Sequence, residues 1–299
     1  MPESGERPAP RAPAAAVRSH PRRYRENLYV YPVLSRRARG LSIGINLNPD
    51  KVCNWDCVYC QVDRTVPPAV REVDEARLRA ELTDLLQEAR SGALFERPEF
   101  AAIPEPFRAV RDVCFAGDGE PPSYTHFAGV VRDVLEIKKR EGFADLKVVV
   151  LTNATLLDRP RVREALRLLD RDVAELWVKL DAGTEAYYRL VDRSSIPFAK
   201  VLANIREAAR ARSIVLQSLF MKIHGQGPPP EEVRAYCDRV TEILEAGGRI
   251  RAIQVYTVAR PPAESFVTPL SDAEVDALAA AIGARVPVPI ETYYSARLA

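Results

Sequence analysis

The sequence has no long apolar run and no sign of a secretory signal. No segment approaches the roughly 18 consecutive apolar residues that a membrane-spanning helix requires. Residues 1–23 contain arginines but lack the apolar core of a signal peptide. We therefore expect a cytoplasmic protein that does not enter membranes. In that reducing compartment, clustered thiols bind metal more often than they form disulfides.

Cysteine is also scarce, and its distribution is uneven. Of five cysteines, Cys53, Cys57 and Cys60 lie within the segment VCNWDCVYC. A disulfide framework requires an even number of thiols, and a closed tetrahedral zinc site requires four ligands. Three thiolates on one loop instead suit an iron–sulfur cluster in which one iron has no protein ligand. Cys114 and Cys237 fall in a predicted strand and helix, where we expect core positions.

The alternative for the three clustered cysteines is a zinc knuckle completed by a distant ligand. His126 or His224 could supply that ligand, but neither belongs to a pair with the spacing of metal ligands. The cysteine spacing therefore favours the cluster.

Positive charge is concentrated at the N-terminus. Residues 1–40 contain nine arginines and three glutamates, whereas the whole chain has a net charge of +2. A basic segment rich in proline and alanine is usually a solvated tail. The alternative is an arm that contacts phosphate groups.

From about Leu41 onward, segments with strand character alternate with helical ones. Apolar residues at three- and four-residue spacing indicate the helices, and short apolar runs indicate the strands. We expect strands at 41–48, 113–117, 146–153, 175–182, 213–223 and 250–258, and helices at 75–90, 126–140, 159–169, 198–211, 230–246 and 271–283. A last short strand is expected at 286–291.

Six βα units in series predict an α/β fold with a parallel sheet, curled into a partial (β/α)6 TIM-like barrel. A doubly wound sheet is the alternative, because sequence alone does not fix the strand order. Residues 1–35 are expected to form a flexible basic arm, 36–265 the barrel, and 266–299 a C-terminal helix and strand packed on the barrel.

Unusual polar residues follow the predicted strands at their carboxyl ends, where α/β folds place their active sites. In strand order they are Asn48 with the cysteine segment, the GDGE sequence at 117–120, Asn153, Lys179 with Asp181, and Tyr256 with Arg260. We expect these side chains to converge on one rim of the barrel.

The CxxxCxxC spacing, followed one strand later by a glycine-rich turn with an acid, resembles the signature of the radical S-adenosylmethionine (SAM) enzymes. The likeness extends over residues 40–260. It implies that Cys53, Cys57 and Cys60 bind one 4Fe–4S cluster and that SAM chelates its open iron. Reductive cleavage of SAM would then give a 5′-deoxyadenosyl radical that abstracts hydrogen from a substrate.

The same resemblance implies positions that contact SAM. Tyr59 matches an aromatic position that packs near the adenine, and the sequence AGDGEP resembles the family's Gly-Gly-Glu motif. Here Asp118 is inserted between Gly117 and Gly119, so the match is not exact. Glu120 is expected to accept a hydrogen bond from the SAM ammonium or to hold the turn. Taken alone, Asp-Gly would be an ordinary β-turn.

Lys179 and Asp181 share one face of a strand that we expect to be buried, where charges are costly unless paired or used. Two roles for these residues remain open. They could contact the ribose or carboxylate of SAM, or they could form a structural ion pair with each other. Asn153 and Gln254 are candidates of the same kind.

Five segments together resemble the radical SAM branch that contains the wyosine-type tRNA-modifying synthases: SRRARGLSIGINLNPDKVCNWDCVYCQVDR, FAGDGEP, LTNATLL, VKLDA and VYTVARPPAE. Some members of that branch bind a second cluster through further, mostly upstream cysteines. This chain has no cysteine before Cys53 and shows no flavodoxin-like domain. Both departures argue against wyosine synthesis itself.

Three functions remain open. The first is radical SAM chemistry with a single cluster on an RNA base, with tRNA as the candidate substrate and an external flavodoxin- or ferredoxin-type electron donor. The second is the same chemistry on a peptide or a small metabolite. The third is an iron–sulfur binding or electron-transfer protein that does not cleave SAM.

Overall fold

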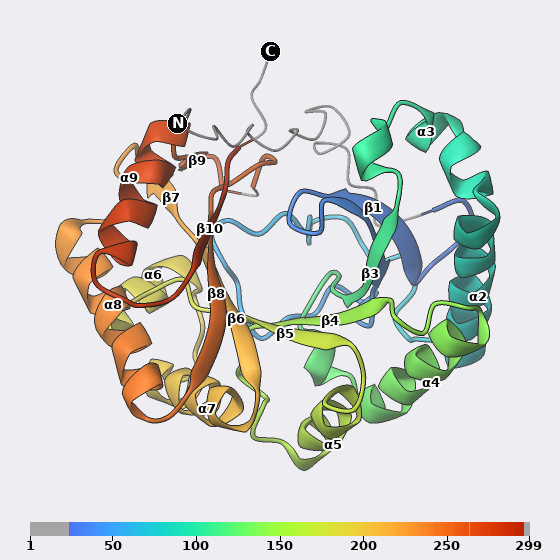
Figure 1. Ribbon diagram of the computed structural model, residues 1–299. Helices are drawn as coiled ribbons and strands as arrows, with labels where there is room; N and C mark the ends of the chain where they lie inside the picture. The colour runs from blue at the N-terminus through green and yellow to red at the C-terminus, as the bar shows by residue number, and fades with distance from the viewer. Residues whose placement is uncertain (1–23, 263, 296–299) are drawn as a thin grey trace, which may run out of the picture.

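The computed structural model describes residues 24–262 and 264–295, and these form one curled sheet with helices on its outer face (Figure 1). The sheet has eight strands in the order β1-β2-β3-β4-β5-β6-β8-β10. They are β1 (Val30–Ser35), β2 (Gly40–Ile45), β3 (Val110–Phe115), β4 (Lys147–Thr152), β5 (Ala174–Lys179), β6 (Ser213–Leu219), β8 (Arg249–Tyr256) and β10 (Ile290–Tyr293). From β2 to β10 all neighbours are parallel, and β1 pairs with β2 antiparallel.

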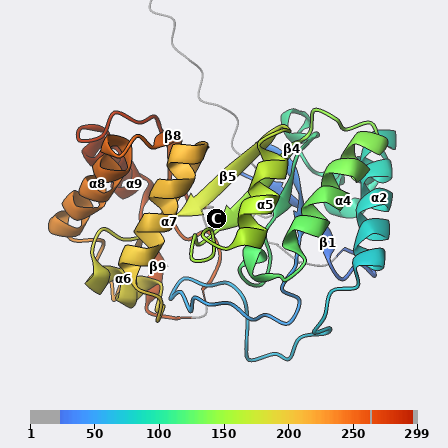
Figure 2. The ribbon, with the colours of Figure 1, turned by 90° about the horizontal axis from the view of Figure 1, so that it is seen from below.

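The helices follow the strands as a right-handed α/β arrangement requires, and they cover the convex side of the sheet (Figure 2). They are α2 (Glu75–Ser91), α4 (Phe127–Arg140), α5 (Pro160–Leu169), α7 (Phe198–Ala211), α8 (Pro230–Glu245) and α9 (Asp272–Gly283). The predicted α/β class and partial barrel are therefore confirmed. In the structure, the six predicted helices follow the six predicted strands in the expected order. The doubly wound alternative is excluded because the strand order follows the chain order.

Sequence patterning missed several elements. They include β1, the short helix α6 (Glu185–Val191) and the strand β9 (Val267–Pro269). The predicted strand 213–223 is divided into β6 and β7 (Met221–Ile223), and β7 pairs with β9 in a separate two-stranded sheet. The expected arm of residues 1–35 therefore overlaps a strand of the main sheet, because the apolar run VYPVL buries its side chains. Residues 1–23, which carry the other part of that prediction, lie outside the described residues.

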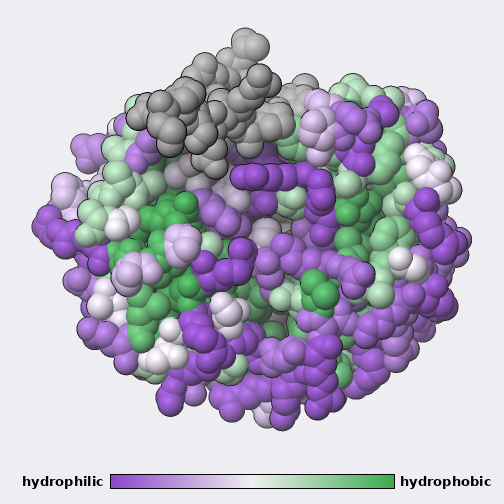
Figure 3. Space-filling model, viewed as in Figure 1, coloured by the Kyte–Doolittle hydropathy of each residue, from purple (hydrophilic) through white to green (hydrophobic). Residues whose placement is uncertain are grey.

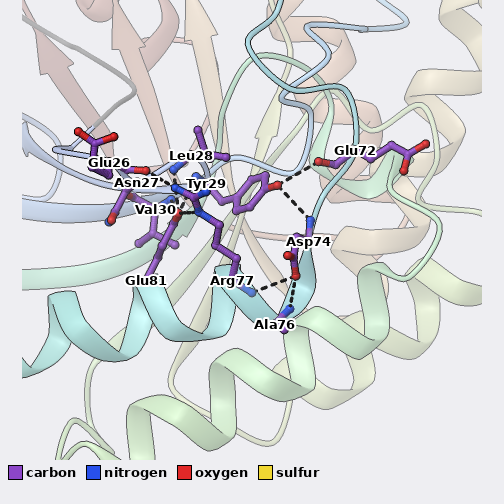
Figure 4. A network of polar contacts seen from close by, with 10 residues as sticks. All are labelled: Glu26, Asn27, Leu28, Tyr29, Val30, Glu72, Asp74, Ala76, Arg77 and Glu81. Carbon is purple, nitrogen blue, oxygen red and sulfur yellow. Dashed lines mark hydrogen bonds and ion pairs between the residues drawn. The ribbon is translucent and has the colours of Figure 1, made fainter.

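Glu81 of α2 fixes the start of β1 (Figure 4). Its carboxylate accepts hydrogen bonds from the backbone N–H groups of Leu28, Tyr29 and Val30, at 2.8, 2.9 and 3.1 Å. Arg77, one helical turn earlier, donates to the same carboxylate at 2.9 Å. Glu81 is buried, so water cannot easily replace its carboxylate as the acceptor for these N–H groups. The contact determines where the first hairpin of the sheet begins.

The outer surface of the described part gives no sign of a membrane segment. The face in Figure 3 is mainly hydrophilic, with smaller apolar areas between polar ones. No helix within residues 24–262 and 264–295 is long and apolar enough to cross a bilayer.

We predict that Glu81→Ala lowers the free energy of unfolding by about 3 kcal/mol, because it leaves buried N–H groups without an acceptor. Urea unfolding followed by circular dichroism measures this change. The matched control is Glu164→Ala in α5, since Glu164 is half-exposed and pairs only with the half-exposed Arg132. The control should change stability by no more than about 0.5 kcal/mol. Equal losses in both variants would contradict the role of Glu81.

Candidate functional site

The three clustered cysteines lie on a long loop, residues 46–74, which connects β2 to α2 and contains no helix or strand. Figure 2 shows this light-blue segment at one end of the barrel, near α6. The loop is fixed to the end of α6 by two backbone hydrogen bonds, from Asp56 N to Asp192 O at 3.1 Å and from Val58 N to Val191 O at 2.9 Å. A loop of this length inside a compact domain is typical of a functional segment. We call it the cysteine loop.

Cys53, Cys57 and Cys60 all line one cavity of about 310 Å³ inside the barrel. None of them forms a disulfide. Burial raises the pKa of the Cys53 thiol to about 11 and that of Cys57 well above its usual value. Arg64 donates to the Cys60 sulfur at 3.1 Å. Buried thiols of this kind require a nearby cation to become thiolates.

Within the described ranges, no group of three or more His, Cys, Asp or Glu side chains is placed to hold a single metal ion. Four free thiols line the cavity, three from the cysteine loop and Cys114 from β3. The three of the loop, with the CxxxCxxC spacing, are a donor set that fits a 4Fe–4S cluster with one open iron. The zinc alternative finds no support from the two candidate histidines. His126 is exposed beside Glu75, at 3.2 Å, and His224 stacks on Phe266 with ring centroids 4.7 Å apart.

The GDGE turn, residues 117–120, packs directly against the cysteine loop, and its glycines are required by this close approach. A Cβ atom on Gly117 would lie 2.3 Å from the Asn46 side chain, and one on Gly119 would lie 2.2 Å from the Val52 carbonyl oxygen. Asn46 also donates to the Asp118 carboxylate at 2.7 Å. The turn and the residue preceding Cys53 therefore have a fixed mutual position.

Glu120 connects the ends of β3 and β4 beneath this turn. Its buried carboxylate accepts hydrogen bonds from the Thr152 hydroxyl and, at 2.9 Å, from the Asn153 backbone N–H. Burial raises the pKa of Glu120 to about 7. The Asn153 side chain then donates to Asn54 of the cysteine loop at 2.7 Å. Glu120 and Asn153 both line the cavity.

Lys179, the last residue of β5, forms an ion pair with Asp181, two residues later, with Nζ and Oδ2 3.0 Å apart. Lys179 also donates to the Tyr256 hydroxyl at 2.7 Å, and Tyr59 donates to Asp181 at 2.5 Å. Burial alone would lower the pKa of Lys179, but the Asp181 carboxylate and Tyr256 raise it by more. The net pKa lies above the usual lysine value, so the amine stays protonated. The structural ion pair that sequence analysis left open is therefore present.

The predicted rim residues come together with two exceptions. The cavity is lined by Cys53, Cys57, Tyr59, Cys60, Gly117, Asp118, Gly119, Glu120, Asn153, Lys179, Tyr256 and Arg260. The rim residues Asn48 and Asp181, and the SAM-contact candidate Gln254, do not line this cavity. Asn48 donates to the Ser123 hydroxyl at 2.9 Å. Gln254 accepts a hydrogen bond from Gln217 at 2.7 Å and donates one to Glu291 at 3.1 Å.

Sequence reasoning misplaced Cys114 and missed two arginines. Cys237 is buried as expected, but Cys114 is only half-buried and its side of β3 faces the cavity. Arg36 and Arg37 also line the cavity. The sequence analysis placed them in the basic N-terminal segment and in a stretch that resembles the wyosine-type branch, but not among the candidate site residues. The β1–β2 hairpin brings both arginines to the cavity, and no local pattern in the sequence indicates that hairpin.

No protein-family model matches this chain. A UPF0026 protein of Helicobacter pylori strain J99 is 26% identical over 259 residues, which cover 84% of this chain and 73% of that protein. A UPF0026 protein of Synechocystis is 31% identical over 181 residues, covering 59% of this chain and 58% of that protein.

Among solved structures, a radical SAM methyltransferase from Sphaerobacter thermophilus superposes with a TM-score of 0.60 at 13% identity, covering 89% of this chain and 69% of that chain. Streptococcus suis SuiB, solved with bound SAM, gives 0.58 at 12% identity, covering 86% of this chain and about half (52%) of that one. The chain therefore has the fold of the radical SAM enzymes.

We predict that Gly119→Ala destabilises the protein by about 1–3 kcal/mol, because the new methyl group overlaps the backbone of the cysteine loop. Gly129→Ala in α4 is the matched control. No atom lies within 4 Å of the position that its Cβ would occupy, and alanine favours the helix by up to about 1 kcal/mol. Urea unfolding of both variants measures the difference. If Gly119→Ala is as stable as the control, the turn does not pack on the loop as described.

Proposed function

We propose that this protein is a radical SAM enzyme that uses one 4Fe–4S cluster to cleave SAM reductively. The observation that carries the proposal is the shared cavity. Three free cysteines, the GDGE turn and the polar ends of β4 and β5 line it together, in a barrel with the radical SAM fold. A fold by itself does not give a function, so the argument depends on this set of side chains.

Cys53, Cys57 and Cys60 would hold the cluster. When bound, the cluster would supply the electron that breaks a carbon–sulfur bond of SAM and yields the 5′-deoxyadenosyl radical. Arg64 would balance part of the thiolate charge at Cys60. The barrel wall would exclude water from the reaction.

The remaining wall residues would bind SAM. Glu120 lies at the end of the glycine-rich turn, where burial raises its pKa, and a cation bound beside it would favour its charged form. The SAM ammonium is such a cation. Tyr59 offers an aromatic face near the cysteines, and Asn153 and Lys179 offer polar contacts on the same wall. The glycines Gly117 and Gly119 with Asp118 would present backbone groups to SAM.

For the substrate we propose an RNA base, with tRNA as the candidate, in the cytoplasm. The support is the likeness of the strand-end motifs to the wyosine-type synthases and the excess of arginine in residues 1–40. A small electron-transfer protein of the flavodoxin or ferredoxin type would reduce the cluster. The cysteine loop contains three cysteines, the number that one such cluster needs, so we propose a single cluster.

The direct test of this function is the formation of 5′-deoxyadenosine. The anaerobically reconstituted protein should contain about four irons and, with dithionite, convert SAM to 5′-deoxyadenosine and methionine. Cys57→Ala should abolish both properties. Cys237→Ala should keep both, because Cys237 is buried in α8 and does not line the cavity. A cluster that survives the loss of Cys57, or a full cluster with no SAM cleavage, would refute the proposal.

We further predict that Glu120→Ala weakens SAM binding. One lost charged hydrogen bond costs about 1.5–3 kcal/mol, or roughly ten- to a hundredfold in affinity. Equilibrium dialysis of the cluster-loaded protein with labelled SAM measures the effect, and iron content verifies that the cluster remains. The control is Glu105→Ala, whose side chain is 87% exposed. Unchanged SAM affinity in Glu120→Ala would show that this carboxylate only holds the turn.

A further inference from the structure

The wall of the cavity includes a basic hairpin turn that the proposed SAM chemistry does not use. β1 and β2 pair from Val30↔Ile45 to Ser35↔Gly40, so residues 36–39 form the turn between them. The Ser35 hydroxyl oxygen accepts a hydrogen bond from Ala38 N at 3.1 Å and closes this turn. Two of its three arginines, Arg36 and Arg37, line the cavity, whereas Arg39 is exposed.

Arg37 is held in place by aromatic rings from distant strands. Its guanidinium lies 5.1 Å from the ring centroid of Tyr256, at the end of β8, and 5.7 Å from that of Trp177 in β5. Guanidinium groups bind aromatic faces in this way and keep their N–H donors available at the edge. The side chain is therefore positioned inside the barrel without an acidic partner.

Arg36 has an unmet requirement for hydrogen bonds. Its Nη1 atom is shielded from solvent and has no hydrogen-bond partner. Burial, together with the charge of Arg37, lowers the pKa of Arg36 to about 10, so the group remains a cation at neutral pH. A buried, charged donor without an acceptor is costly, and native structures usually satisfy it with protein, solvent or ligand.

The acids of the same wall do not fully neutralise these two arginines. Asp118 and Glu120 are held by Asn46, Thr152 and Asn153. Asp112 accepts from the Ser42 hydroxyl, and burial raises its pKa. Among the described residues, neither Arg36 nor Arg37 has a carboxylate within ion-pair distance, whereas Lys179 of the same wall is paired with Asp181. Burial raises the pKa of Asp112 most, and the charge of Arg37 lowers it, so Asp112 compensates Arg37 in part without an ion pair. The positive charge on the hairpin side of the cavity is therefore only partly compensated.

We propose that Arg36 and Arg37 form a subsite for an anionic group of the substrate, a phosphate or a carboxylate. The two guanidinium groups would bind its oxygens, and Trp177 and Tyr256 would hold Arg37 in place. Because the cysteine loop lines the same cavity, a substrate fixed through this anion extends toward the proposed site of radical formation. This inference rests on the proposed function for the identity of its ligand as a substrate, but the anion site itself does not require SAM cleavage.

The test is equilibrium dialysis of the full-length, cluster-loaded protein with labelled inorganic phosphate and, separately, labelled malonate. Wild type should bind one anion per chain. Arg36→Gln and Arg37→Gln should each weaken binding at least about tenfold, since each removes charge-assisted hydrogen bonds. Arg36→Lys keeps the charge without the planar pair of donors, so it should restore part of the affinity. Arg39→Gln, in the same turn but exposed, should bind as wild type does.

The results distinguish a phosphate ligand from a carboxylate ligand. They also test the subsite separately from the proposed SAM cleavage. Binding of phosphate alone identifies a phosphate ester, and binding of malonate alone identifies a carboxylate. No binding of either probe by wild type, or equal binding by Arg36→Gln and Arg39→Gln, would overturn the subsite. Displacement of the probe by saturating SAM would assign the site to the carboxylate of SAM and would also overturn it.

SAM cleavage by the wild-type protein is measured on the same preparation. Cleavage without anion binding would reject the subsite and retain the proposed function. Anion binding that depends on Arg36, without cleavage, would retain the subsite and reject the proposed function.

Discussion

The buried carboxylate of Asp181 connects the elements on which the candidate site depends. One of its oxygens accepts from the backbone N–H of Leu219 at the end of β6, at 2.7 Å. The other accepts from Tyr59 of the cysteine loop and forms the ion pair with Lys179. Lys179 in turn reaches Tyr256 of β8. Removal of one partner from such a buried pair typically costs about 3–5 kcal/mol, because the other charge is left without compensation.

This network also explains how an irregular loop is held in one place. The cysteine loop has no helix or strand to provide its own hydrogen bonds, so its position comes from contacts to the barrel. Tyr59 contacts Asp181, Asn54 contacts Asn153 and Thr155, and Gly119 packs on Val52. Each contact is made by a residue at the carboxyl end of a strand or in the turn that follows it. The fold thus positions the three thiols partly through residues that line the cavity, Asn153 and Gly119, and partly through Asp181 and Thr155, which do not.

The sequence predicted the barrel, and the convergence of most rim residues on one cavity, for one physical reason. Strand and helix periods are local signals, and the carboxyl ends of parallel strands necessarily share one edge. The parts that were missed depend on contacts that no local pattern encodes. Arg37 meets Trp177 some 140 residues further along the chain, and the face that Cys114 presents follows from the register of β3 against β2 and β4. The strand β1 was missed because its apolar run follows a basic, proline-rich segment.

The central claim is that three cysteines of one loop hold a cluster that SAM contacts directly. Electron paramagnetic resonance of the dithionite-reduced, reconstituted protein tests it, because a ligand bound at the open iron changes the electronic environment of the cluster. The account predicts a signal from a single reduced 4Fe–4S cluster. That signal should shift when SAM is added and should not shift when the same buffer without SAM is added. A cluster signal that SAM leaves unchanged would contradict it.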